Sequence, residues 1–218
     1  LIGTQGRIPR KHAGLMSWLP VNYSRIGPIS WFVEDSALLF DVMSGPHPES
    51  EPMTIQEKEY FLKDIEAGIK NKKIAWSNDF NTRVVDLEIK EIFNNNLKIF
   101  ENLGAKLEEL KFDFDLNDLE QPFHKYLMHT FSFCVNEEFY NIDPKKLMPH
   151  VKNTIERGSK VMASDYAKAL AQLMEYRSKM DKIFDKYDYI LSPTVAIPPH
   201  KFNERPIINN GKIEILNI

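Results

Sequence analysis

Residue types that could carry out hydrolysis occur in this chain, but their spacing assembles no known nucleophilic site. A serine or cysteine hydrolase needs a nucleophile, a general base and donors for an oxyanion. No Gly-x-Ser-x-Gly segment is present, and no serine is followed three residues later by lysine. Cys134 lies in an apolar run that favours a buried structural thiol. The segment Gly158-Ser159-Lys160 fits a break between helices. We therefore identify no catalytic residue in the chain.

The histidines and acidic residues are spaced poorly for a metal site. The six histidines are scattered, and no His-Glu-x-x-His segment occurs. Asp113, Asp115 and Asp118 form the densest acidic cluster, but the glycine that a calcium-binding loop needs for its turn is absent. No glycine-rich loop is present to hold a phosphate group. We expect no bound metal ion and no cofactor.

The composition is that of an ordinary globular protein. Of the 218 residues, 43% are hydrophobic and 27% are charged, and the formal net charge is -3. Basic side chains are interleaved with acidic ones, which argues against a nucleic-acid partner. No apolar run approaches the roughly 18 residues of a membrane span, so no membrane partner is expected. A single cysteine excludes an internal disulfide and fits a reducing, cytoplasmic location.

Apolar periodicity and turn signals predict helices that alternate with strands. The expected helices cover 33–44, 54–69, 86–103, 117–140, 144–157 and 165–187. The first has an apolar stripe of Leu38, Leu39 and Val42, and the second opens with a capping box at Thr54 to Glu57. The expected strands cover 73–77, 106–110 and 189–191, and the chain beyond Thr194 reads as loop. Strand, helix and strand over 73–110 predict a parallel βαβ unit with a right-handed crossover, and hence an α/β class.

Several short motifs occur in an order and spacing that resemble the second half of the amidase signature family. They are Gly6-Arg7-Ile8-Pro9, Gly27-Pro28-Ile29 with the helix from Val33 to Ser44, the strand from Lys73 to Ser77, Leu103-Gly104-Ala105, Glu156-Arg157-Gly158 and the segment from Tyr189 through Ser192-Pro193-Thr194. Each motif is weak alone, and the set in this order is fairly specific. Ile2-Gly3-Thr4 departs from the Lys-Pro-Thr that usually precedes the Gly-Arg turn, and residues 112–149 match no pattern of the family.

The resemblance implies a mixed, twisted β-sheet flanked by helices, of which this chain forms an incomplete part. It also implies a nucleophilic serine, a second serine with a cis peptide and a lysine, all of which precede Leu1 in the family's order. We therefore expect a fragment of an amidase, a hydrolase of C–N bonds other than peptide bonds, which forms a serine acyl-enzyme and releases an acid and ammonia or an amine. The fragment by itself is expected to be inactive. Two alternatives stay open: an A-type subunit of glutamyl-tRNA amidotransferase, and a non-catalytic half-fold that binds a partner.

Three residues are candidates for binding a small-molecule amide substrate. Arg157 could meet a substrate carboxylate, as similarly placed arginines do in some relatives of this family. Ser192 and Thr194 follow a strand, at the edge where ligands gather in open α/β sheets. The structural alternatives are a surface ion pair for Arg157 and turn chemistry for the two hydroxyls.

The domain organisation follows from the same resemblance. Residues 1–218 are expected to be a fragment of a single amidase-signature domain. Its parts are a loop-rich segment with one helix at 1–52, the βαβ unit at 53–112, a helical region at 113–188, and a strand, turn and tail at 189–218. An incomplete sheet would leave an exposed edge, through which a homo-oligomer could form.

Overall fold

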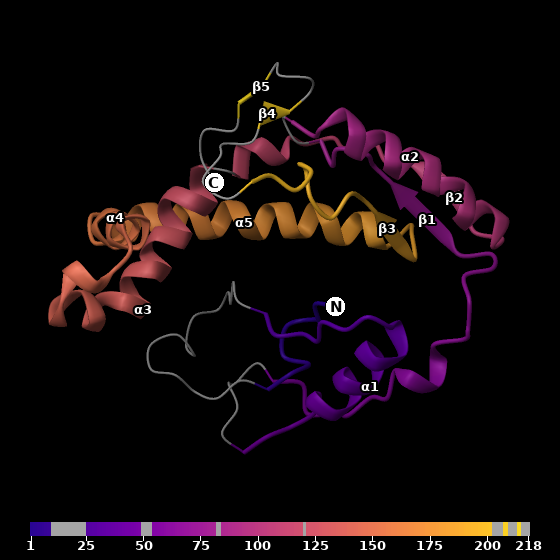
Figure 1. The fold of residues 1–218 in the computed structure, drawn as a ribbon, viewed down its shortest axis with the longest axis horizontal. Helices are drawn as coiled ribbons and strands as arrows, with labels where there is room; N and C mark the ends of the chain where they lie inside the picture. The colour runs from indigo at the N-terminus through magenta and orange to yellow at the C-terminus, as the bar shows by residue number, and fades with distance from the viewer. Residues whose placement is uncertain are drawn as a thin grey trace. The chain divides into compact units, whose positions relative to one another are not determined.

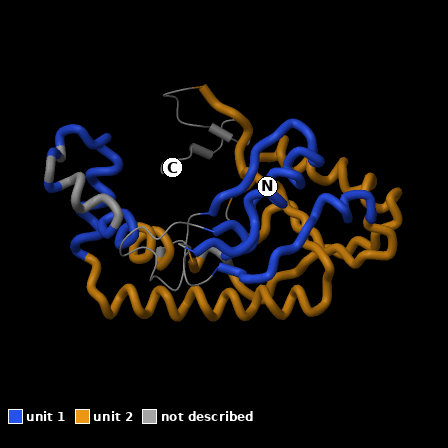
Figure 2. The backbone as a smooth tube through the Cα atoms, turned by 90° about the horizontal axis from the view of Figure 1, so that it is seen from below, with its two compact units in different colours: residues 1–68, 129–160 blue, residues 69–128, 161–218 orange. Residues whose placement is uncertain are grey.

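The computed structural model describes residues 1–9, 25–48, 54–81, 84–119, 121–201, 207–208 and 213–214. The chain divides into two compact units, each built from two separate stretches (Figure 2). The first unit contains residues 1–68 and 129–160, and the second contains 69–128 and 161–218. The α/β class predicted from the sequence is confirmed, since a parallel sheet is combined with helices (Figure 1). The single-domain boundaries stay a prediction.

A three-stranded parallel sheet organises the second unit. The central strand is β1 (Lys73–Trp76), which pairs with β2 (Lys106–Glu109) on one side and β3 (Tyr189–Leu191) on the other. Ile74 and Ala75 on the central strand are 1% and 0% exposed, as expected for a strand with neighbours on both sides. All three predicted strands are confirmed, with ends within one residue of those expected.

The helix α2 (Leu87–Asn102) connects β1 to β2 and completes the predicted βαβ unit. Its first turn is capped by Asp86, whose carboxylate accepts a hydrogen bond from the N–H of Glu88 at 2.9 Å. Gly104 follows the helix with φ at +86°, a backbone conformation that residues with a Cβ atom rarely adopt. The rings of Trp76 and Phe93 lie 6.4 Å apart, so the helix packs on the central strand.

The longest helix, α5 (Ala163–Phe184), leads into β3 and packs against a π-helix that covers Gln121–Met128. Leu127 and Ala169, at 0% and 1% exposure, are the most buried residues of these two helices. The loop expected beyond Thr194 is wrong in one part, because β4 (Ile207–Ile208) and β5 (Ile213–Glu214) pair as antiparallel strands. An Asn-Gly dipeptide between them is a hairpin signal that the sequence already contained.

The first unit contains the helix α1 (Val33–Met43). Its bounds confirm the helix predicted at 33–44. Its predicted inner stripe is wrong: Phe40 and Asp41 are its buried residues, while Leu38, Leu39 and Val42 are exposed. Asp41 is buried because its carboxylate accepts the N–H groups of residues 61–62 at 2.6 and 3.1 Å. Hydrogen bonding to the backbone thus decides which face of α1 turns inward.

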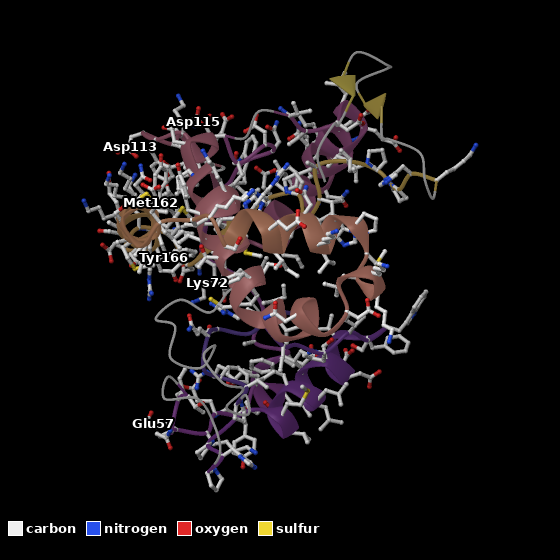
Figure 3. The ribbon with its side chains drawn as sticks, turned by 90° about the vertical axis from the view of Figure 1, so that its left-hand side faces the viewer. Glu57, Lys72, Asp113, Asp115, Met162 and Tyr166 are labelled. Carbon is white, nitrogen blue, oxygen red and sulfur yellow. The ribbon has the colours of Figure 1, made fainter. Side chains whose placement is uncertain are left out.

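The helix predicted from Thr54 to Ile69 is also wrong. Only a 3-10 turn at Leu62–Asp64 forms there, and Glu57 lies exposed on an irregular segment (Figure 3). The N–H of Ile55 donates to the carbonyl of Gly6 at 2.8 Å, and Arg7 forms an ion pair with Glu59 at 2.9 Å. These tertiary bonds hold the segment against residues 6–7 and override the local capping pattern.

The helices α3 (His129–Ile142) and α4 (Pro149–Gly158) pack against each other in the first unit. The helix predicted at 144–157 is split into a 3-10 turn at Pro144–Lys146 and α4. Pro149 explains the break, since the residue before a proline is driven out of the helical region and Met148 has ψ at 143°. Ile155 and Gly158 are the buried residues of α4.

Candidate functional site at the carboxyl ends of the strands

The carboxyl ends of β1 and β3 bring two distant segments side by side in the second unit. The N–H of Ser77, directly after β1, donates to the carbonyl of Leu191 at 3.0 Å. Further along, the N–H of Asp86 donates to the carbonyl of Ala196 at 2.8 Å. Residues 77–81, 84–86 and 191–196 therefore form one edge of the site. In open α/β sheets this edge is where ligands usually bind.

A hydrogen-bonded polar cluster occupies the segment after β1. Asp79 accepts from the ammonium of Lys90 at 2.9 Å, from the N–H of Asn81 at 3.0 Å and from the hydroxyl of Ser77 at 3.4 Å. Burial raises the pKa of the Asp79 carboxyl, but Lys90 and the backbone donor bind its charged form, and the net pKa lies below its usual value. The cluster thus contains a carboxylate that is ionised at neutral pH.

The backbone of this segment is held in an unusual conformation. Phe80 and Asn81 both have φ at 52°, in the left-handed region that side chains rarely adopt. The N–H of Phe80 donates to the Ser77 hydroxyl at 2.9 Å, and the Asn81 amide donates to the carbonyl of Phe114 at 2.7 Å. Two adjacent residues of this kind store strain that the surrounding bonds must offset. The two hydrogen bonds hold residues 77–81 in this conformation.

Two of the three predicted binding residues lie at this edge. Ser192 and Thr194 are exposed in the turn after β3. Within the described part of the chain, neither hydroxyl makes a hydrogen bond that would hold the turn, so both can meet a ligand.

Arg157 is not brought to them within either unit. It lies exposed in the last turn of α4, which belongs to the first unit. It forms no ion pair with the described residues.

Ser77, Asp79 and Lys90 were not identified from the sequence as site residues. The signal that could have found them is positional. Residues directly after a parallel strand lie at the same edge of the sheet as residues after its neighbours, so Ser77 could have been paired with Ser192 once both strands were predicted. The contribution of Lys90 depends on the side-chain contact and has no sequence signal.

A separate open groove of about 600 Å³ lies between α5 and the π-helix, also in the second unit. It is lined by Asp118, Pro122, Tyr126, Asp165, Lys168, Ala169, Ala171 and Gln172. Its charged walls differ from the mostly apolar lining of typical small-molecule pockets. The strand-end edge is therefore the stronger candidate for binding an amide.

The acidic cluster of the sequence does not form a cation site among the described residues. Asp113 and Asp115 are exposed (Figure 3), and Asp118 accepts a hydrogen bond from the hydroxyl of Tyr176 at 3.3 Å. No group of three or more histidine, cysteine or acidic side chains that could hold a metal ion occurs in the described ranges. None of the described helices is long and apolar enough to cross a membrane.

Comparison with known proteins shows relatives with amide chemistry in their names. The chain is 26% identical over 233 residues to the A-type subunit of glutamyl-tRNA(Gln) amidotransferase from Geobacillus sp. strain WCH70, covering 93% of this chain and 46% of that protein. It is 28% identical over 218 residues to the corresponding protein of Cenarchaeum symbiosum, covering 88% of this chain and 44% of the relative. The chain thus spans about half the length of the curated relatives that it matches.

Solved structures confirm the fold. A bacterial aryl acylamidase of the amidase signature family superposes with a TM-score of 0.85 at 20% identity, covering 97% of this chain and 45% of that one. The family profile described as Amidase matches residues 3–215, nearly the whole sequence. The chain belongs to the Amidase family.

Proposed function

We propose that this chain is part of an amidase-type hydrolase that cleaves a carboxylic amide to an acid and ammonia or an amine. Support comes from the family profile, which matches residues 3–215, and from relatives about twice as long. In the proposed reaction a serine attacks the amide carbonyl, the amine leaves with a proton, and water hydrolyses the acyl-enzyme. The serine, the bridging serine and the lysine lie outside residues 1–218, and the chain alone is inactive.

The contribution of this chain is to bind and orient the amide. Ser192 and Thr194 present free hydroxyls beside the hydrogen-bonded segment 77–81, where they can donate to or accept from the polar group of a substrate. Arg157 has an exposed guanidinium that would pair with a substrate carboxylate in two parallel hydrogen bonds. A small-molecule amide is thus the proposed ligand.

A second candidate function is that of an amidotransferase A-type subunit. It is favoured by the names of the two curated relatives described above. Such a protein would release ammonia from a donor amide and pass it to a second substrate, in place of free hydrolysis. The fate of the amide nitrogen, followed with an isotope label, separates the two functions. A hydrolase releases the labelled nitrogen as free ammonia. An amidotransferase subunit transfers it to the acceptor, and only when the partner subunits are present.

The natural polypeptide that contains these residues should be treated with a fluorophosphonate probe, which labels an activated serine. We expect one labelled serine, outside residues 1–218, and loss of hydrolysis of an aryl acetamide in parallel. The isolated 218-residue chain is the control and should stay unlabelled. A labelled serine within residues 1–218 would show that the catalytic residues have been placed wrongly, and no labelling with no amide turnover would refute the hydrolase.

The binding role is tested by kinetics on the same polypeptide. Ser192→Ala and Thr194→Val should raise KM by about tenfold with little change in kcat, the pattern of a lost hydrogen bond that is made equally in ground and transition states. Ser178→Ala, on the exposed face of α5, is the matched control and should change neither constant. Unchanged KM in both site variants would remove these residues from the binding site.

A further inference from the structure

The turn at residues 192–194 is held on both sides by the chain that follows β1. Before the turn, the carbonyl of Leu191 accepts a hydrogen bond from the N–H of Ser77 at 3.0 Å. After the turn, the carbonyl of Ala196 accepts a hydrogen bond from the N–H of Asp86 at 2.8 Å. The position of the two hydroxyls in the turn therefore depends on the backbone that supplies these two donors.

Asp79 and Lys90 connect this backbone to α2. One oxygen of the Asp79 carboxylate accepts a hydrogen bond from the Lys90 ammonium at 2.9 Å. The other oxygen accepts from the N–H of Asn81 at 3.0 Å and from the hydroxyl of Ser77 at 3.4 Å. The same hydroxyl accepts from the N–H of Phe80 at 2.9 Å. A single carboxylate thus joins a helix to both ends of the short segment after β1.

A second set of contacts connects the segment to the chain after β2. The side-chain amide of Asn81 donates to the carbonyl of Phe114 at 2.7 Å, and the rings of Phe80 and Phe112 lie 4.9 Å apart. The Phe114 ring lies 5.4 Å from the ring of Tyr176 on α5. The segment therefore has a charged contact with α2 and a chain of aromatic contacts that reaches α5.

The ion pair contributes little to α2 itself. Lys90 lies near the N-terminal end of the helix, where a cation is repelled by the positive end of the helix dipole. The side chains of Lys90 and Asp79 are 28% and 35% exposed, and ion pairs open to solvent add little stability. The consequence of the pair is therefore geometric, because it fixes the place of the carboxylate to which Ser77 and Asn81 donate.

We propose that Asp79 and Lys90 are positioning residues, whose ion pair holds the turn at residues 192–194 where its hydroxyls meet the amide substrate. Neither residue touches the amide. They act through the hydrogen bond from Ser77 to Leu191. The role in substrate binding rests on the proposed function, whereas the hold on the turn rests on the hydrogen bonds of this segment alone.

Kinetics with an aryl acetamide on the natural polypeptide test the role in binding. Lys90→Met should raise KM by about fivefold with little change in kcat, whereas Lys90→Arg, which keeps a cation, should restore the parent KM. Adding Asp79→Asn to Lys90→Met should raise KM no further, because the two side chains act as one pair. Circular dichroism first shows that each variant keeps its helix content.

Lys72→Met is the matched control. The Lys72 ammonium bonds to Asp188 at 3.3 Å, so this variant removes a similar ion pair from the same sheet. Lys72 and Asp188 directly precede β1 and β3, so their pair lies at the amino ends of the strands, away from the turn. We expect KM and kcat of Lys72→Met to equal those of the parent.

Amide hydrogen exchange on the natural polypeptide tests the hold on the turn without any activity. The N–H of Ser77 donates to Leu191, so its exchange rate reports the bond that holds the start of the turn. Lys90→Met should speed this exchange by at least about tenfold, and Lys72→Met should leave it unchanged.

Unchanged exchange in Lys90→Met overturns the proposal, whether or not the polypeptide hydrolyses an amide. Faster exchange with an unchanged KM also overturns it, as does an equal rise of KM in Lys90→Met and Lys72→Met, which a general loss of stability would produce. If no amide is hydrolysed, the proposed hydrolase fails together with the role in binding, while faster exchange still supports the hold on the turn. The two proposals therefore fail through different measurements.

Discussion

The packing of α3 against α4 depends on the missing side chain of Gly158, and Gly158→Ala tests this. A Cβ at this position would lie 2.6 Å from the carbonyl carbon of His129 and 2.8 Å from the Cβ of Phe133, and closer still to the His129 oxygen. These are distances that packed atoms do not tolerate. Because the nearest atoms belong to the backbone of α3, a rotamer change cannot relieve the clash, and the two helices would have to separate.

The expected loss follows from two opposing contributions. Alanine is favoured over glycine within a helix by about 1 kcal/mol, less at the last residue of α4. Overpacking a close contact costs about 1–3 kcal/mol, and more where backbone must move. We expect a net loss of about 2 kcal/mol in the free energy of unfolding, and a melting temperature lower by roughly 4–8 °C for a chain of this size.

Urea unfolding followed by far-UV circular dichroism measures this change. Asn153→Ala is the matched control, since Asn153 is exposed in the middle of the same helix and should be neutral or slightly stabilised by the substitution. Phe133→Ala would not relieve the contact, since alanine keeps the Cβ of that position and the His129 carbonyl remains in place. A Gly158→Ala protein as stable as the parent would refute the close helix crossing.

Other predictions concern the two units separately. Asp41→Ala should cost about 2–3 kcal/mol in urea unfolding, because it leaves the N–H groups of residues 61–62 without an acceptor, and an effect below about 0.5 kcal/mol would contradict this. The pKa of Asp79 is lower in the folded protein than in the unfolded chain. The ionised carboxylate therefore stabilises the fold above the unfolded pKa, and this stabilisation is lost as the pH falls through the folded pKa. Asp79→Asn should therefore flatten the decrease in melting temperature between about pH 5 and pH 2, as should Lys90→Met, and an unchanged profile would argue against the pair. Ser192→Ala should raise KM without lowering kcat, as described above.

The regular elements could be predicted because their signals are local. The apolar period of 86–103, the Asp86 cap and the Gly104 stop define α2 without reference to any other part of the chain. The short apolar run of 73–77 defines β1 in the same way. The Ser192-Pro193-Thr194 turn was predicted as a site because it follows a strand, and its binding role stays a prediction.

Two of the wrong predictions, the helix at 54–69 and the inner stripe of α1, are those in which distant groups decide. A capping box at Thr54 is worth about 1 kcal/mol, and the bonds from Ile55 to Gly6 and from Arg7 to Glu59 outweigh it. The stripe of Leu38 and Val42 failed for a related reason. An apolar stripe predicts which residues prefer burial, but it cannot say which neighbour is present to bury them.

By itself, the sequence determined the three strands of the parallel sheet, the βαβ unit that α2 completes and the family resemblance, since each depends on spacing along the chain. Only the tertiary structure decided that Ser77 lies beside Leu191, that Asp79 pairs with Lys90, and that α1 turns Asp41 inward and Val42 outward. These depend on hydrogen bonds and contacts between residues far apart in the chain. Such hydrogen bonds and apolar contacts form only where the fold brings the two partners close together.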